Sequence, residues 1–175
     1  MHEPTDPYAL NRFVDAQAHD YAQALAEIRA GQKRLHWMWF IFPQFAGLGS
    51  SATAQQFAIR SRGEASAYLA HSVLGPRLIA CAEAALAIPN RGARAVFDTP
   101  DDLKLRSCAT LFAQVAPERS VFEQLLERYF DGQSDARTLA LLEHTDRTLS
   151  LASTPSKSRM RRRAGRGRAP PSFAP

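Results

Sequence analysis

The aromatic residues of this chain are concentrated in one segment, His36-Trp37-Met38-Trp39-Phe40-Ile41-Phe42-Pro43-Gln44, which is followed by Gly47-Leu48-Gly49-Ser50-Ser51. Both tryptophans and three of the ten phenylalanines (Phe40, Phe42 and Phe45) fall within residues 37–45. Side chains of this size are buried in folded proteins, so the segment predicts the centre of the core. Apolar residues beside a few polar groups line ligand pockets as well as ordinary cores. The segment therefore locates the centre of the fold but names no reaction.

The chain on both sides of this segment has the apolar spacing of α-helices. Apolar residues recur three and four positions apart from Leu10 onward, and Gly31 stands where a helix commonly ends. Residues 36–42 contain few β-branched side chains, which favours a buried helix stopped by Pro43, and residues 43–51 form a loop in this interpretation. No alternating strand pattern of any length occurs. These patterns predict an all-α fold, a single compact domain of six to eight short-to-medium helices.

Local start signals place several of these helices. Ser61 and Glu64 have the spacing of a capping box, in which each side chain accepts a hydrogen bond from the other residue's backbone N–H. Pro117-Glu118 is expected to open a later helix. The stretch Thr99-Pro100-Asp101-Asp102 combines a cap, a proline at the first helical position and acids that the helix dipole favours.

Charge is distributed unevenly along the 175 residues, a length near the usual size of one domain. The net charge of +5 comes from residues 152–175, which carry seven basic side chains and no acid. The rest of the chain has 15 basic against 17 acidic side chains. The C-terminal segment is also rich in proline and serine, so it cannot bury enough apolar surface to offset its ordering entropy. We expect a helical domain over residues 1–150 and a disordered basic tail over residues 151–175.

The two cysteines, the N-terminal residues and the apolar runs predict the cellular compartment. Cys81 and Cys108 lie within apolar helical patterns and lack the spacing of a zinc site, which predicts buried, reduced thiols and no metal. The first residues contain acids and no apolar stretch, so no secretory leader is predicted. The longest apolar run, residues 37–43, is too short to cross a bilayer. These features predict a cytoplasmic protein without membrane contact.

Several short stretches resemble those of one known family. They are Gly31-Gln32-Lys33, residues 36–44, Gly47-Leu48-Gly49, Ala58-Ile59, Glu64-Ala65, Tyr68-Leu69, Leu74-Gly75, residues 97–107, Thr110-Leu111-Phe112 and Asp131-Gly132. From about Asp6 to about Leu142 the chain is similar to the small, mostly bacterial family called domain of unknown function 1810, whose members sometimes carry the label calpastatin. The resemblance implies an all-helical single domain and no established activity, and the basic tail lies outside it. Nothing in the sequence supports a calpain-inhibitor role.

Residues in and beside the aromatic segment form the candidate ligand site, which consists of Lys33, His36, Trp37, Gln44, Gly47, Gly49 and Ser50. In this interpretation the tryptophan stacks on the ligand, while the glycine loop and Ser50 hold phosphate through N–H and hydroxyl groups. Lys33 or His36 supplies the positive charge. Such an arrangement suits a small anionic ligand.

Each of these features also has a structural explanation. His36 is the best candidate for catalysis, because an imidazole group can give or take a proton near neutral pH. A histidine at the edge of the core, hydrogen-bonded to a backbone carbonyl group, also explains it. The glycine loop matches neither the P-loop nor the dinucleotide fingerprint, and a tight turn explains it as well. Arg60, Arg62 and Arg77 would line an anionic pocket if residues 58–78 fold over the loop, and would otherwise face solvent.

Two functional hypotheses follow. The first is a helical domain that binds a small anionic ligand, a nucleotide or a nucleotide-sugar, with catalysis left open and no cofactor specified. The second is a non-enzymatic interaction module whose tail contacts nucleic acid without sequence preference, because basic side chains release counterions from phosphates. The arginines of that contact are Arg161, Arg162, Arg163, Arg166 and Arg168. The sequence specifies no oligomeric state.

Overall fold

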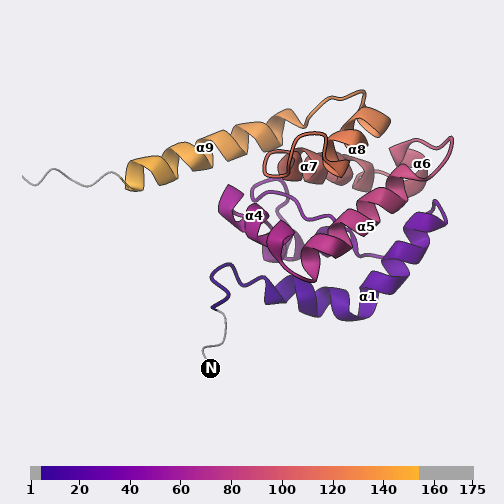
Figure 1. Cartoon of the computed structure of the whole chain (residues 1–175), viewed down its shortest axis with the longest axis horizontal. Helices are drawn as coiled ribbons and strands as arrows, with labels where there is room; N and C mark the ends of the chain where they lie inside the picture. Colours follow the sequence, from indigo (N-terminus) through magenta and orange to yellow (C-terminus); the bar gives the residue numbers. More distant parts are fainter. Residues whose placement is uncertain (1–4, 154–175) are drawn as a thin grey trace, which may run out of the picture.

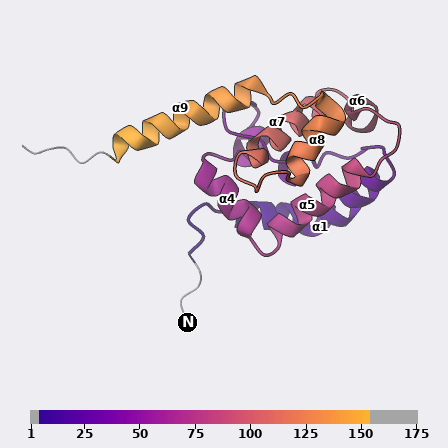
Figure 2. The ribbon, with the colours of Figure 1, turned by 45° about the horizontal axis from the view of Figure 1, so that its top comes forward.

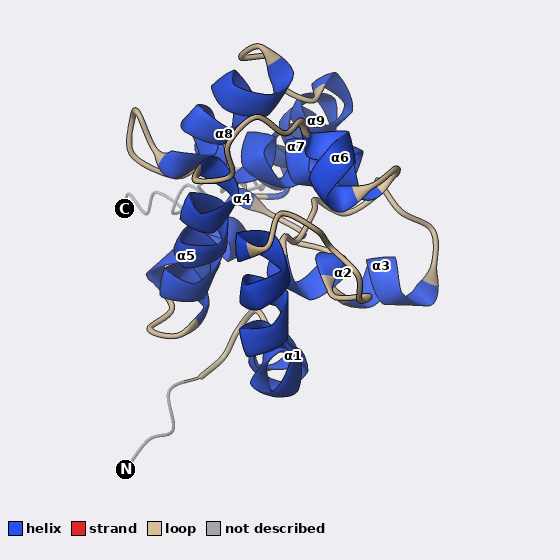
Figure 3. Cartoon of the chain, turned by 90° about the vertical axis from the view of Figure 1, so that its right-hand side faces the viewer, coloured by secondary structure: helices blue, strands red, loops and turns tan. Residues whose placement is uncertain are grey.

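The structure, a computed structural model, describes residues 5–153. Its helices are α1 (Asn11–Arg29), α2 (Met38–Ile41), α3 (Ala52–Gln56), α4 (Arg62–Ala70), α5 (Leu74–Leu86), α6 (Ala93–Phe97), α7 (Asp101–Ala113), α8 (Val121–Phe130) and α9 (Ala136–Ala152). Six of these have seven or more residues, and no strand occurs within residues 5–153 (Figure 3). The predicted all-α single domain is confirmed. Across the same residues, no helix combines the length and the apolar character that a membrane span requires.

The helices pack around α5, which contacts α1, α4 and α8 (Figure 1). Helix α7 in turn contacts α8 and α6, and Figure 2 shows α1 and α5 side by side. Aromatic rings connect the helices through the core: Phe13 of α1 meets Tyr68 of α4 edge to face at 5.1 Å, and Tyr68 lies 5.4 Å from Phe112 of α7. Phe112 lies 5.5 Å from Phe122 of α8. Such offset and edge-to-face pairs add stability beyond the burial of their area.

The aromatic segment lies in the core, as predicted. Trp37, Phe40, Phe42 and Phe45 are all buried. The helix within the segment is shorter than expected, because α2 covers only Met38–Ile41. Phe42 has φ −121° and ψ 73°, outside the helical region. It precedes Pro43, and the proline ring disfavours helical angles in the residue before it.

Gly31 ends α1 as the sequence predicts. Its φ is +70°, a conformation that glycine adopts at little cost. The Gly31 N–H donates to the Ile28 carbonyl oxygen at 2.8 Å, and the Gln32 N–H donates to the Glu27 carbonyl oxygen at 3.1 Å. This pair of bonds is the Schellman arrangement, which satisfies the free carbonyl groups at the end of a helix.

Three helix starts differ in detail from the sequence-based expectation. Helix α7 begins at Asp101 with Pro100 as its N-cap residue, rather than with a cap at Thr99 and Pro100 at the first helical position. Helix α8 begins at Val121 rather than at Pro117-Glu118, because Ser120 and Glu123 form a complete capping box and Arg119 has a left-handed φ of 59°. At α4 the Ser61 hydroxyl accepts from the Glu64 N–H at 3.0 Å, as predicted. The Glu64 carboxylate, however, accepts from the Arg60 N–H at 2.8 Å instead of from Ser61.

Helix α9 extends beyond the rest of the molecule (Figures 1 and 2). Its first half is anchored, because Thr138 and Leu142 are buried. Its second half exposes Leu149 and Leu151, which are 55% and 78% exposed. The helix runs through Ala152, past the expected domain boundary at residue 150. The predicted disorder of the tail concerns residues that lie, from 154 onward, outside the described part of the chain.

Candidate functional site

A hollow of about 270 Å³ lies beside the loop that follows α2. The segments before and after the start of α3 form it, and a parallel β-bridge between Phe45 and Ile59 holds them together. In this bridge the Ile59 N–H donates to the Gln44 carbonyl oxygen at 2.9 Å, and the Ala46 N–H donates to the Ile59 carbonyl oxygen at 2.8 Å. The residues that line the hollow are Gln44, Phe45, Ala46, Gly47, Gly49, Ala54, Gln55, Ala58 and Arg60. The hollow thus brings together three residues of the candidate ligand site: Gln44, Gly47 and Gly49.

The packing of this loop explains why both of its lining positions are glycine. Gly47 has φ +94°, and a Cβ atom there would lie 3.3 Å from the Leu141 side chain of α9. The Arg137 guanidinium, also on α9, donates to the Gly47 carbonyl oxygen at 3.1 Å. At Gly49 a Cβ atom would lie only 2.6 Å from the Cβ of Ala54. The loop is therefore held between α3 and the anchored half of α9.

The charge of the hollow comes from Arg60, because none of its other lining residues is charged. The Arg60 side chain is exposed, and its hydrogen bond to the Gln55 carbonyl oxygen is long, at 3.4 Å. Within residues 5–153, nothing accepts a hydrogen bond from the backbone N–H groups of Gly47, Leu48 and Gly49. A guanidinium beside free N–H groups is an arrangement that attracts anions.

Of the three arginines expected near the loop, only Arg60 lines the hollow. Arg62 lies on α4 and pairs with Asp146 of α9 at 2.7 Å. Arg77 lies 4.7 Å from the centre of the Tyr21 ring, on the face where α5 meets α1. Residues 58–60, rather than the whole of 58–78, therefore fold against the loop.

Ser50 does not line the hollow. It is exposed, and its carbonyl oxygen accepts from the Gln55 side-chain amide at 3.0 Å. The neighbouring Ser51 caps α3, because its hydroxyl oxygen accepts from the Ala54 N–H at 3.1 Å. The two serines thus fix the start of α3, which forms one wall of the hollow.

Trp37 is bound to the core by Glu27. The indole is 1% exposed, so no ligand can stack on it unless the fold opens. Its Nε1–H donates to a Glu27 carboxylate oxygen at 2.8 Å, and the same oxygen accepts from the N–H groups of Arg34 and Leu35 at 2.8 and 3.1 Å. Burial alone would raise the pKa of Glu27, but these hydrogen bonds lower it below its ordinary value.

Lys33 belongs to an ion cluster rather than to the hollow. Its Nζ lies 2.8 Å from a carboxylate oxygen of Asp101, and it also donates to the Leu35 carbonyl oxygen at 2.6 Å. Lys104 Nζ lies 2.8 Å from the other Asp101 oxygen. Burial acts to raise the pKa of Asp101, but the two lysines lower it. His36 is exposed, and the described residues give it no hydrogen-bond partner.

The structure therefore divides the candidate residues into two groups. Gln44, Gly47 and Gly49 line the hollow, while Lys33 and Trp37 are held by Asp101 and Glu27. The sequence analysis did not predict Gln55 as a lining residue or Lys104 as a partner in the ion cluster. Gln55 carries no local pattern that points to the hollow, whereas Lys104 has the i, i+3 spacing of a helical ion pair with Asp101, which the sequence analysis did not use.

The described residues contain no cluster suited to a metal ion and no exposed thiol. Among residues 5–153 no group of three or more histidine, cysteine or acidic side chains is placed to hold a metal ion. Both cysteines are buried and free, as the sequence predicts. Burial raises the pKa of the Cys81 thiol to about 12, which keeps it protonated and unreactive at neutral pH.

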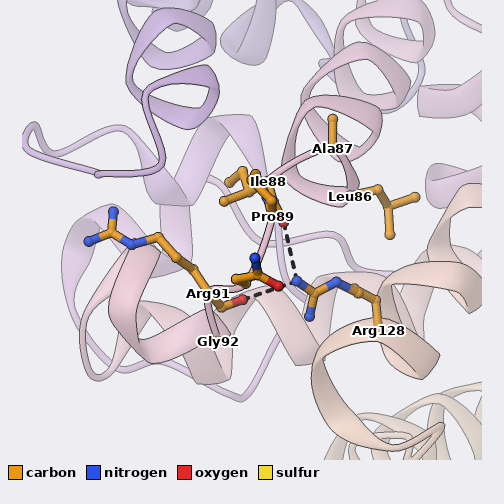
Figure 4. A pocket seen from close by; sticks show the side chains of 8 residues that line it. Leu86, Ala87, Ile88, Pro89, Arg91, Gly92 and Arg128 are labelled. Carbon is orange, nitrogen blue, oxygen red and sulfur yellow. Dashed lines mark hydrogen bonds between the residues drawn. The ribbon is translucent and has the colours of Figure 1, made fainter.

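A larger hollow of about 620 Å³ lies at the end of α5 (Figure 4). Arg128 points into it and donates to the carbonyl oxygens of Ile88 and Arg91 at 3.2 and 3.3 Å. The Arg91 guanidinium donates to the Gly31 carbonyl oxygen at 2.6 Å. Both arginines thus fasten the turn over residues 87–92 to its neighbours, and the hollow contains none of the candidate residues.

Comparisons with known proteins agree with the fold. Residues 7–142 match a family described as "Protein of unknown function (DUF1810)". No curated protein matches the chain. The chain is similar to a solved structure, that of the conserved hypothetical protein Rv1873 from Mycobacterium tuberculosis, at 49% sequence identity and a TM-score of 0.77. That similarity covers 79% of this chain and 99% of the other. The match over residues 7–142 has the extent that the sequence motifs indicated.

Proposed function

Because this chain belongs to the DUF1810 family, which brings no known activity, we propose from the geometry alone that it binds a small phosphate-bearing anion, such as a nucleotide, in the hollow beside residues 44–49. The observation that supports this function is the convergence of Gln44, Gly47 and Gly49 on one hollow whose single charged residue is Arg60.

Arg60 supplies the principal attraction in this proposal. Its guanidinium offers several N–H donors in a planar fork that matches two phosphate oxygens, and it is free to move because it is exposed. The N–H groups of Gly47, Leu48 and Gly49 supply further donors. Gln44, which is half-buried, fixes the orientation through its amide.

The size of the hollow limits what it encloses. Pockets that enclose a drug-sized ligand measure roughly 300–1,000 Å³. A hollow of about 270 Å³ is just below this range, so it suits a phosphate or sugar phosphate. The base of a nucleotide would extend outside it. Catalysis is no part of this proposal, because the hollow contains no acid, histidine or nucleophile.

A thermal-shift and titration series on the full chain tests the proposal. The probes are inorganic phosphate, adenosine monophosphate and a nucleotide-sugar. A ligand at about a hundred times its dissociation constant stabilises the folded state by roughly 2.7 kcal/mol, which raises the melting temperature measurably. Arg60→Gln should weaken binding about tenfold, since it removes a charged hydrogen-bond donor.

Arg62→Gln is the matched control. It removes the same charge two residues away, but its side chain points to Asp146 and not to the hollow. Losing that partly exposed ion pair costs at most about 1 kcal/mol of stability and leaves ligand affinity unchanged. If no probe raises the melting temperature, or if Arg60→Gln binds as well as Arg62→Gln, the proposal is wrong.

The basic tail gives a second proposal, non-specific contact with nucleic acid through Arg161, Arg162, Arg163, Arg166 and Arg168. The observation in favour is that residues 152–175 hold seven basic side chains and no acid. Removing these residues should abolish the gel shift of RNA or DNA at low salt and leave the small-ligand titration unchanged. An unchanged gel shift after the deletion would overturn the tail's role.

A further inference from the structure

Two lysines share one carboxylate on the face where the loop after α1 meets the start of α7. Lys33 Nζ contacts Oδ2 of Asp101 and Lys104 Nζ contacts Oδ1, each at 2.8 Å. The side chains of Lys33, Lys104 and Asp101 are only 8%, 19% and 17% exposed, respectively. The cluster therefore carries two positive charges against one negative charge in partly buried surroundings, where charge is screened weakly.

The hydrogen-bond capacity of the lysines is not used up. Each ammonium has three N–H donors. Lys33 uses one on Asp101 and one on the Leu35 carbonyl oxygen, whereas Lys104 uses one on Asp101. In the part of the chain that the structure describes, no other acceptor reaches Lys104 Nζ. At least one donor on each lysine is thus available to a further partner.

Each ammonium also lies over an indole. Lys104 Nζ is 4.4 Å from the centre of the Trp39 ring, and Lys33 Nζ is 5.1 Å from that of Trp37. The rings hold the ammoniums in place by cation–π attraction and offer them no hydrogen-bond acceptor. Trp39 is half-buried and the Lys104 side chain is 19% exposed, so the cluster reaches solvent at Lys104.

We propose that Lys33 and Lys104 form a second anion site, which takes a phosphate or similar oxyanion between the two ammonium groups. The Asp101 carboxylate shows that two oxygens of one small anion span both lysines. A phosphate presents oxygens at similar separation, so it bridges the free donors in the same way and neutralises the remaining positive charge. This site shares no residue with the hollow of Arg60.

Tryptophan fluorescence of the full chain reports on this site, because the two tryptophans of the chain are the rings beside the two lysines. Titration with inorganic phosphate, at constant ionic strength set with sodium chloride, should change the emission saturably. Lys104→Gln should raise the phosphate concentration at the midpoint at least about tenfold, since it removes a charged hydrogen-bond donor. Lys104→Arg should preserve the response.

Two further variants separate this site from a structural role and from the hollow. Asp101→Asn should bind phosphate at least as tightly as the unaltered chain, because it removes a negative charge that lies beside the two ammonium groups and repels the anion. Arg60→Gln should leave the midpoint unchanged, so failure at the hollow is distinguishable from failure here. No saturable change in the unaltered chain, an unshifted midpoint in Lys104→Gln, or loss of the response in Asp101→Asn would each overturn the proposal.

Discussion

The Glu27 carboxylate accepts the indole N–H of Trp37 at 2.8 Å, and both residues are almost fully buried, at 4% and 1% exposed. The same carboxylate accepts the backbone N–H groups of Arg34 and Leu35. The connection between α1 and α2 is therefore folded around one buried negative charge. This arrangement fixes the aromatic segment in the core and sets the position of the loop that follows it.

Glu27→Gln should destabilise the protein by about 2–3 kcal/mol. The substitution removes charged hydrogen bonds and turns two amide N–H donors toward groups that are themselves donors. Urea unfolding followed by circular dichroism measures the change. Glu143→Gln, at an exposed position of α9, is the control and should change stability by less than about 0.5 kcal/mol. Equal stability of the two variants would contradict the role of Glu27.

Stability should fall in acid because Glu27 and Asp101 have lowered pKa values in the folded protein. A carboxylate with a lowered folded pKa stabilises the fold above its unfolded value and loses that contribution as the pH falls through the folded pKa. The ordinary pKa values are 4.5 for Glu27 and 3.8 for Asp101, so this contribution to stability should be lost below about pH 4.5. Melting temperatures between pH 7 and pH 3 should fall less steeply in Glu27→Gln. A parallel decline in both proteins would exclude Glu27 as the source.

Gly49→Ala should disturb the hollow. The added Cβ would lie 2.6 Å from that of Ala54, so the loop or α3 must shift, at a cost of about 1–3 kcal/mol. Gly92→Ala is the control, because a Cβ there meets nothing within 4 Å and the lost N-cap preference costs less than about 1 kcal/mol. Thermal unfolding of both variants checks this. Equal melting temperatures would show that residues 47–49 are not packed as described.

His36→Ala should leave both folding and ligand affinity unchanged. His36 is exposed, has no partner among residues 5–153 and does not line the hollow, so its removal should alter stability by less than about 0.5 kcal/mol. The thermal-shift series used for Arg60→Gln measures both quantities. A large loss of affinity would place the ligand across His36 and would contradict the assignment of the site to the hollow.

The sequence predicted best those features that neighbouring residues determine. Gly31 could be placed at the end of α1 because the left-handed turn and its hydrogen bonds involve only the adjoining residues. The bridge between Phe45 and Ile59 and the ion pair between Lys33 and Asp101 join segments far apart in the chain, and no periodicity encodes them. Ligand stacking on Trp37 was expected from the residue type alone. The indole is instead buried and hydrogen-bonded to Glu27, ten positions earlier in the chain.

Amide chemical-shift mapping by NMR tests the central claim most directly. Titration of the isotope-labelled full chain with adenosine monophosphate should move the N–H signals of Gly47, Leu48 and Gly49 saturably. Arg60→Gln should raise the concentration at half-saturation about tenfold, while Arg62→Gln leaves it unchanged. Unmoved signals at these three residues, or shifts that persist unchanged in Arg60→Gln, would contradict the proposal that the hollow binds a phosphate-bearing anion.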